Sequence, residues 1–100
     1  MSLERITQGV EGRLLDLTGL KYKVKFDLGD DGIVFVDGRA NPPTLSNEDG
    51  EADCTIRLSP DSMEKLIAGT LNPTLAYSMG KLKVDGSMGV ALKVASMLED

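Results

Sequence analysis

The sequence predicts an α+β fold in which residues 1–100 form a single domain. It opens with an apolar stripe at helical spacing, continues with short segments of alternating apolar and polar residues, and returns to helical patterns near its end. The length of 100 residues suits one hydrophobic core. Hydrophobic residues make up 41% of the chain and charged residues 27%, which is ordinary for a globular protein.

The first predicted element is a helix over residues 3–17. Its apolar residues recur at steps of three and four: Leu3, Ile6, Val10, Leu14 and Leu17. Gly9 and Gly12 each weaken this helix by about 1 kcal/mol relative to alanine. We therefore expect the helix to need a partner surface.

Strands follow this helix. In residues 20–28 apolar residues alternate with charged ones, which predicts a strand with one buried face. A turn at 29–32 leads to residues 33–36, a strand that is apolar on both faces and is therefore expected at the centre of a sheet. Residues 39–46 have the composition of a short edge strand, and residues 52–59 alternate again.

The last forty residues are mostly helical in pattern. Short helices are expected from Pro60 to Gly69 and within residues 72–80, each with a proline at its first position, and a strand is expected within 81–86. Residues 87–98, "SMGVALKVASML", predict a terminal helix with a single charge, Lys93. The stripe predicted to pack on the sheet consists of Met88, Ala91, Leu92 and Ala95. The neighbouring flanks of this helix consist of Val90, Val94, Met97 and Leu98.

Composition argues against several classes of function. The chain has no histidine, which excludes Ser-His and Cys-His nucleophilic pairs and histidine-containing metal sites. The acidic turns do not have the residue spacing of a calcium-binding loop. Cys54 is at an inward-facing position of its predicted strand, and we interpret it as a small buried hydrophobic residue. We therefore expect no catalytic residue, metal or cofactor, and a protein that is not an enzyme. The net charge of −5 argues against nucleic-acid binding.

Other features of the sequence bear on its location and surfaces. A lone cysteine, and the lack of both a secretory pattern and a long apolar run, predict a cytoplasmic protein. The outward strand positions hold six basic residues: Lys21, Lys23, Lys25, Arg57, Lys81 and Lys83. They form either an anion-binding sheet face or a solvated face balanced by Asp27, Asp53 and Asp85. Four methionines after residue 62 fit either a deformable cavity or an ordinary core. "GSMG" (86–89) is interpreted as a tight turn rather than a phosphate site.

Residues 52–98 resemble the sterol carrier protein domain, the non-specific lipid-transfer family. The matching segments are "ADCTI", "LIAGTLNP", "MGKLKVDG" and "MGVALKV", in the same order and spacing over nearly fifty residues. The earlier half is similar in pattern, with an opening helix, a lysine-bearing strand and a hairpin. The whole chain resembles a small, free-standing member of bacterial type.

This resemblance implies a mixed five-stranded sheet with helices over one face, and an apolar tunnel between the two layers. It implies binding of fatty acyl chains, acyl-coenzyme A, isoprenoids or sterol-like molecules, with no bond chemistry. Alternation along the strands and spacing along the helices then select nine candidates for the tunnel wall: Phe26, Phe35, Met63, Leu66, Leu75, Met79, Met88, Leu92 and Met97. Three lysines are candidates to contact an anionic headgroup: Lys81, Lys83 and Lys93.

The expected partners are a lipid or fatty-acyl ligand and, transiently, a membrane surface or a partner enzyme. An alternative function is kept beside this one. In it, the apolar terminal helix packs against a second copy of the chain or a larger enzyme, and the protein is an interaction or dimerisation module without a small ligand.

Overall fold

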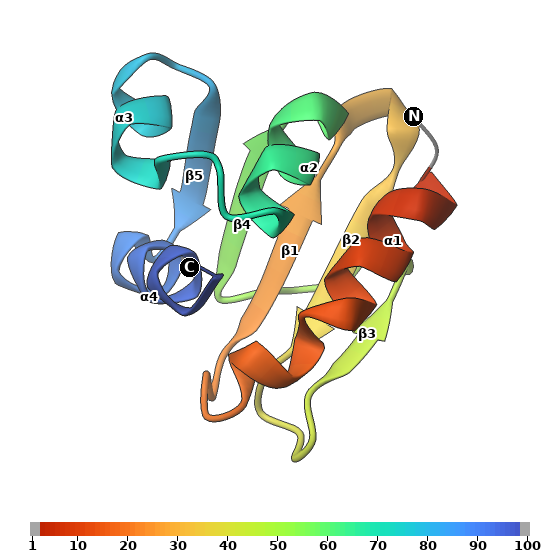
Figure 1. Ribbon diagram of the computed structural model, residues 1–100. Coiled ribbons are helices and arrows are strands. Elements are labelled where there is room, and N and C mark those ends of the chain that lie inside the picture. Colours follow the sequence, from red (N-terminus) through yellow and green to blue (C-terminus); the bar gives the residue numbers. More distant parts are fainter. Residues whose placement is uncertain (1–2, 99–100) are drawn as a thin grey trace.

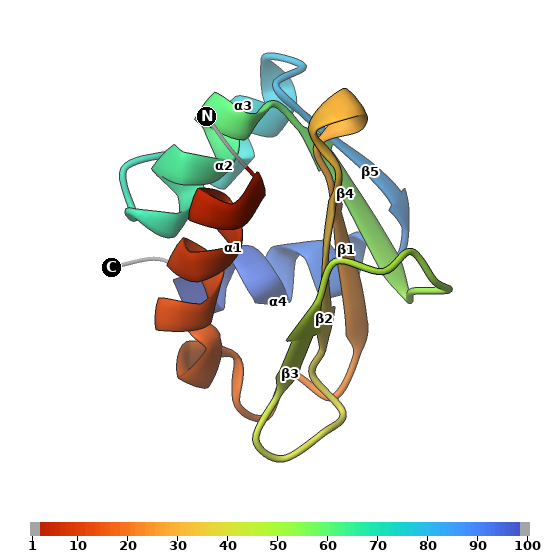
Figure 2. The same cartoon turned by 90° about the vertical axis from the view of Figure 1, so that its right-hand side faces the viewer.

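The computed structural model describes residues 3–98, which form one sheet with all helices on one of its faces (Figures 1 and 2). In chain order the elements are α1 (Leu3–Gly12), the 3-10 helix η1 (Leu14–Leu17), β1 (Lys23–Asp27), the 3-10 turn η2 (Gly29–Asp31), β2 (Ile33–Asp37), β3 (Thr44–Ser46), β4 (Cys54–Leu58), α2 (Pro60–Ile67), α3 (Pro73–Ser78), β5 (Leu82–Gly86) and α4 (Met88–Leu98). The predicted α+β class is confirmed.

The sheet has five strands in the order β3-β2-β1-β4-β5. The pair β1–β4 is parallel and the other three pairs are antiparallel, so the sheet is mixed, as the resemblance implied. The connection from β4 to β5 contains both α2 and α3. This long connection carries α3 to the outer edge of the sheet, where it packs on β5 (Figure 1).

The core lies between the sheet and the helices. Phe26 in the centre of β1 is fully buried, and Ile6 and Val10 of α1 pack into the same cluster. In β1 and β2 the burial of side chains alternates along the strand, as expected when one face of a sheet is covered. α1 and α2 therefore derive stability from the one apolar face that each packs on this core.

The first helix ends earlier than predicted. α1 stops at Gly12, and the chain continues as η1, whose Leu17 is still fully buried. Glycine is a poor helix former, and the Arg13 N–H donates to the carbonyl of Val10 at 3.0 Å in a 3-10 turn. The Arg13 guanidinium then donates to the carbonyls of Ile67 and Leu98, which joins this turn to the ends of α2 and α4.

The two helices between β4 and β5 begin as predicted. The Ser59 hydroxyl accepts from the N–H of Ser62 at 3.1 Å, and the Asn72 side chain accepts from the N–H of Leu75 at 3.1 Å. In each case a proline occupies the first helical position. These caps satisfy backbone donors that the first turn leaves free.

Candidate functional site

A groove lined almost wholly by apolar side chains lies between α3, β5 and α4. The cavity within it measures about 70 Å³, below the range of roughly 300–1,000 Å³ seen for ligand pockets, so a ligand can enter only if side chains at the groove move. Its lining residues are Ile56, Leu66, Pro73, Thr74, Tyr77, Leu82, Val84, Met88, Ala91, Leu92, Val94 and Ala95. The polar side chains among them are a threonine and a tyrosine, so the groove suits an apolar ligand.

The sheet and α2 build the inner part of the groove. Leu82 and Val84 alternate along β5 and face the helices, and Ile56 of β4 lies beside Val84 in the register. Leu66, near the end of α2, is buried beneath α4 and completes this part. The outward strand positions of 81–86 are charged and the inward ones apolar, so the pattern of the sequence accounts for this wall.

The mouth of the groove lies between α3 and α4. Tyr77 of α3 and Met88 and Leu92 of α4 line the groove and are also 48%, 38% and 54% exposed. A half-exposed apolar side chain at a groove is one that a ligand can cover on binding. These three residues therefore form the part of the site where ligand contact removes the most apolar surface from water.

A tight turn places α4 against the sheet. Gly86 has φ +88°, and a Cβ built on it would lie 2.6 Å from the carbonyl oxygen of Asp53. Ser87 follows, its N–H donating to that same oxygen at 3.0 Å and its hydroxyl accepting from the N–H of Val90 at 3.2 Å. The first turn of α4 thus has its own cap, in agreement with a structural turn. A Cβ on Gly89 would meet no close neighbour except the Ser87 hydroxyl, so close packing is confined to Gly86.

The predicted orientation of α4 is wrong. The residues buried in the core are Val90, Ala91, Val94 and Leu98, three of which were expected on the flanks. Met88 and Leu92, which were expected on the sheet, stand at the groove, and Ala95 lines it too. This helix is apolar around most of its circumference, so periodicity alone does not select which face is buried.

Three of the nine predicted wall residues, Leu66, Met88 and Leu92, come together at the groove. Phe26 and Met63 are fully buried in the closed core, and Met97 packs against that core while partly buried. The remaining three stand elsewhere: Phe35, Leu75 and Met79.

Phe35 lies on the opposite face of the sheet from the groove. Its neighbours Val34 and Val36 face the helices, while its ring lies 3.5 Å from where a Cβ on Gly50 would stand. Leu75 and Met79 are 56% and 60% exposed and stand outside the groove lining. Pro73 and Tyr77 were not predicted as lining residues, because a short helix with apolar residues on several sides leaves its inner face undetermined.

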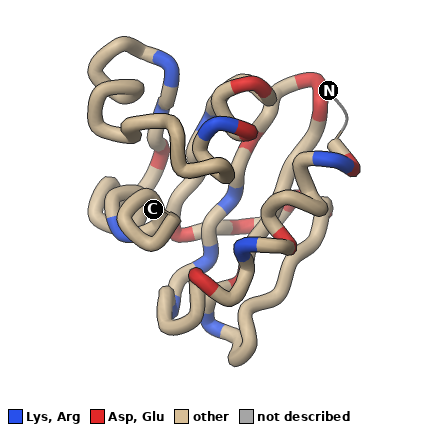
Figure 3. Tube along the Cα trace, viewed as in Figure 1, with Lys and Arg blue, Asp and Glu red and all other residues tan. Residues whose placement is uncertain are grey.

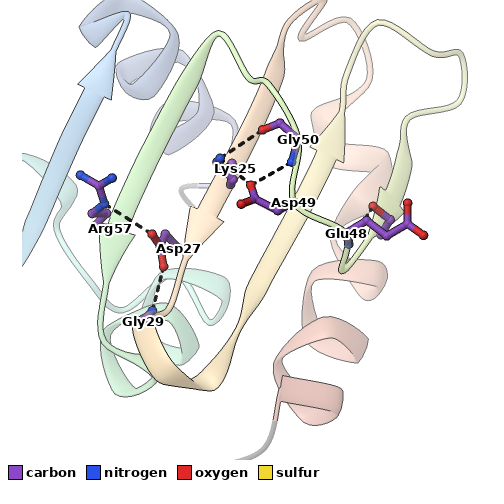
Figure 4. A network of polar contacts seen from close by, with 8 residues as sticks. Lys25, Asp27, Gly29, Glu48, Asp49, Gly50 and Arg57 are labelled. Atoms are coloured by element: carbon purple, nitrogen blue, oxygen red, sulfur yellow. Dashed lines mark hydrogen bonds and ion pairs between the residues drawn. The ribbon is translucent and has the colours of Figure 1, made fainter.

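The outer face of the sheet carries paired charges (Figure 4). Lys25 Nζ lies 2.7 Å from a carboxylate oxygen of Asp49 and also donates to the Gly50 carbonyl at 3.1 Å. The hydrogen bond from Lys25 is the main cause that lowers the pKa of the Asp49 carboxyl. Arg57, in the middle of β4, pairs with the carboxylates of Asp27 and Asp85. These pairs agree with a solvated, balanced face rather than an anion-binding one.

The three lysines proposed for a headgroup lie outside the groove lining. Lys81 directly follows the turn that ends α3, and Lys83 is exposed on the β5 edge strand. Lys93 Nζ stands 5.6 Å from the centre of the Tyr22 ring and 3.5 Å from the Gly19 carbonyl. Their contact with a ligand stays a prediction.

Cys54 is fully buried at the start of β4, and burial raises the pKa of its thiol. Residues 3–98 contain no cluster of three or more acidic, histidine or cysteine side chains arranged to hold a metal ion. No helix in this range is long and apolar enough to cross a membrane.

Comparison with known proteins agrees with this geometry. The model of the SCP-2 sterol transfer family matches residues 3–99. Sterol carrier protein 2 of Bos taurus is 42% identical over 53 residues, which are 53% of this chain and 10% of that protein. Hydroxysteroid dehydrogenase-like protein 2 of Bos taurus is 28% identical over 87 residues, 85% of this chain and 21% of that protein. The matched part is thus a small fraction of each of these longer relatives.

Solved structures share the fold at low sequence identity. A sterol carrier protein 2 from Aedes aegypti in complex with palmitate has a TM-score of 0.75 and 21% identity, covering 98% of this chain and 96% of that one. Sterol carrier protein 2 from Yarrowia lipolytica in its apo form has a TM-score of 0.72 and 22% identity, covering 95% of this chain and 84% of that one. Both likenesses extend over nearly the whole sheet and its helices.

Proposed function

Because the chain belongs to the SCP-2 sterol transfer family, we propose that residues 1–100 form one lipid-binding domain that holds an acyl chain in the groove between α3, β5 and α4. The observation that carries the proposal is the composition of the groove, where ten of the twelve lining side chains are apolar. The Aedes aegypti structure, similar in fold, was solved with palmitate, and this supports an acyl chain as the ligand class.

The apolar part of the ligand would supply most of the binding free energy. Each methylene moved out of water contributes about 0.8 kcal/mol. Micromolar affinity corresponds to about 8 kcal/mol, so a ligand of that affinity would need to bury about ten methylenes, plus those whose contribution offsets the cost of ordering the chain. Entry of the chain would push Met88 and Leu92 aside, since methionine is flexible and both side chains border the mouth.

The polar end of the ligand would lie at the mouth. The hydroxyls of Thr74 and Tyr77 are the side-chain hydrogen-bonding groups in the groove lining, and both belong to α3. A carboxylate there would accept from them and otherwise remain in water, which avoids the cost of burying a charge. The lysines that follow α3 would add electrostatic attraction for an anionic headgroup.

We propose that the domain carries or presents the lipid without breaking or forming bonds. Among the lining residues the Tyr77 phenol is the one titratable group, and no acid, thiol or amine stands beside it in the groove. Nucleophilic or general acid–base chemistry needs a nucleophile and a base within hydrogen-bonding reach. Cys54 is buried away from solvent and is unsuited to act as that nucleophile.

Two measurements test this function together. Native mass spectrometry of protein purified from cells is expected to detect a copurified lipid, and fatty acids are expected to displace a fluorescent fatty acid from the protein. Shortening the acyl chain by two methylenes should weaken binding by about fifteenfold while the chain still fits the groove. An absence of copurified lipid combined with no displacement by any chain length would refute the proposal.

A further inference from the structure

The four methionines after residue 62 differ in their access to solvent. Met63 is fully buried in the core, and Met97 packs against that core while partly buried. Met79 is 60% exposed at the end of α3, outside the groove lining. Met88, the first residue of α4, is 38% exposed and lines the groove. Among residues 3–98 it is thus the methionine that a reagent dissolved in water can reach at the wall of the groove.

The surroundings of Met88 are apolar and almost without charge. α3 contains no charged residue and α4 contains one, Lys93, so both helices are mostly tan in Figure 3. The hydrogen-bonding side chains of the groove lining are those of Thr74 and Tyr77. A thioether suits such a wall, because it is apolar and polarizable. A chemical change that made this side chain polar would therefore alter the groove itself.

We propose that Met88 is an oxidation site, and that its conversion to methionine sulfoxide by a peroxide turns the groove into a form that binds acyl chains weakly. In this step a lone pair of the thioether sulfur attacks one peroxide oxygen. The S–O bond forms as the O–O bond breaks, and with hydrogen peroxide the second oxygen leaves as water. The sulfur loses two electrons and the peroxide gains them. Methionine sulfoxide reductase returns the product to methionine at the expense of a thiol reductant.

Oxidation would weaken binding whichever way the sulfoxide group turns. If the oxygen stays in the groove, it brings a polar atom against the methylenes of the ligand, and that atom gives up its contact with water. If the group turns out into water, the ligand loses the apolar surface that Met88 offers it. Either outcome corresponds to a loss of affinity of about fivefold or more. The inference rests on the lipid-binding function proposed above and adds a chemical control of the same site.

A bound acyl chain should in turn protect Met88. A ligand that covers the exposed part of this side chain keeps peroxide from its sulfur, whereas Met79 lies outside the groove lining and stays uncovered. Occupancy of the groove should therefore slow oxidation at one of these two exposed methionines and leave the other unchanged. This contrast follows from the placement of the two side chains and does not depend on the reactivity of methionine in general.

Peptide mass spectrometry of protein treated with hydrogen peroxide measures oxidation at each methionine. We expect Met79 and Met88 to be oxidised and Met63 to stay reduced while the protein is folded. Saturation with palmitate should slow oxidation of Met88 several-fold and leave that of Met79 unchanged. Displacement of a fluorescent fatty acid should show that treated protein binds at least about fivefold more weakly. Treatment with methionine sulfoxide reductase should restore the original affinity.

Two variants assign the effect to one sulfur. M88L keeps an apolar side chain of similar size and removes the oxidisable atom, so it should bind fatty acid like wild type and be unaffected by peroxide. M79L/M97L keeps Met88 and should lose affinity on oxidation as wild type does. Thermal melts before and after treatment establish that each protein is folded. The protection of Met88 by palmitate needs no variant, so it decides the question if M88L does not fold.

Several results would overturn the oxidation proposal. They are a Met88 that peroxide leaves reduced, an equal loss of affinity in M88L and wild type, and a rate of oxidation at Met88 that palmitate does not change. The untreated protein separates this proposal from the one before it. Fatty-acid binding that oxidation of Met88 does not weaken refutes the oxidation proposal alone. Untreated protein that binds no fatty acid refutes the acyl groove and, with it, the control of that groove by Met88.

Discussion

Replacing Leu92 by serine should weaken binding of a long-chain fatty acid by about fivefold. The Leu92 side chain lines the groove and is 54% exposed, so a bound acyl chain can cover about half of it. Full burial of a leucine contributes about 1.5–3 kcal/mol, and half of that is about 1 kcal/mol, or about fivefold in Kd. Met88 is 38% exposed, and the double variant M88S/L92S should lose about 2 kcal/mol, or about thirtyfold.

Displacement of a fluorescent fatty acid measures these changes, and L15S provides the control. Leu15 is 73% exposed on η1, outside the groove, so its replacement removes the same side chain without altering ligand contact. Both substitutions are at exposed helical positions and should change the free energy of unfolding by less than about 1 kcal/mol. Equal affinity of L92S and wild type for palmitate, or an equal loss in L15S, would contradict the placement of the ligand.

Four further predictions concern the fold. G86A should lower the free energy of unfolding in urea by about 2 kcal/mol or more, because the new Cβ would meet the Asp53 carbonyl. Gly80 is also at positive φ but has open space around it, so G80A should lower that free energy by about 1 kcal/mol. Equal losses in the two variants would contradict the close contact at Gly86. Burial raises the pKa of the Cys54 thiol, so as pH rises the unfolded chain releases this proton before the folded chain does. The free energy of unfolding should therefore fall as pH rises above the ordinary pKa of a thiol, and this fall should be absent in C54A. A disulfide-exchange reagent should leave the native thiol unmodified, and rapid reaction at neutral pH would refute its burial. R57Q should lower the free energy of unfolding by less than about 1 kcal/mol, because the ion pairs of Arg57 are exposed to solvent. Thermal melting measures this change, and a loss above about 2 kcal/mol would mean that solvent does not screen these pairs.

The elements of the fold could be predicted wherever one local rule was decisive. The alternation in β1 and β4 predicted their buried faces, and the prolines Pro60 and Pro73 predicted where α2 and α3 begin. β1 starts later than expected, at Lys23, because Lys21 adopts a positive φ of 67°. Such a backbone conformation is uncommon for lysine and leaves no mark on the apolar pattern.

The site was harder to predict than the fold, because its walls are set by tertiary packing. α4 is apolar on most sides, and its buried face follows from the turn at Gly86, which fixes the direction in which the helix leaves β5. Phe35 belongs to a strand that is apolar on both faces, so the alternation of apolar and polar residues could not show whether its side chain faces the groove or the side near Gly50. Met63 and Leu66 lie on one stripe of α2, yet one is closed in the core and the other borders the groove.

The most direct test of the acyl groove is to locate the ligand by NMR. With uniformly ¹³C-labelled palmitate, we expect intermolecular contacts between its methylenes and the side chains of Ile56, Met88 and Leu92. The ring of Phe35, on the other face of the sheet, should have none. Contacts confined to Phe35 or to the outer face, or saturation of the protein with palmitate without any contact to Met88 or Leu92, would contradict a ligand held between α3, β5 and α4.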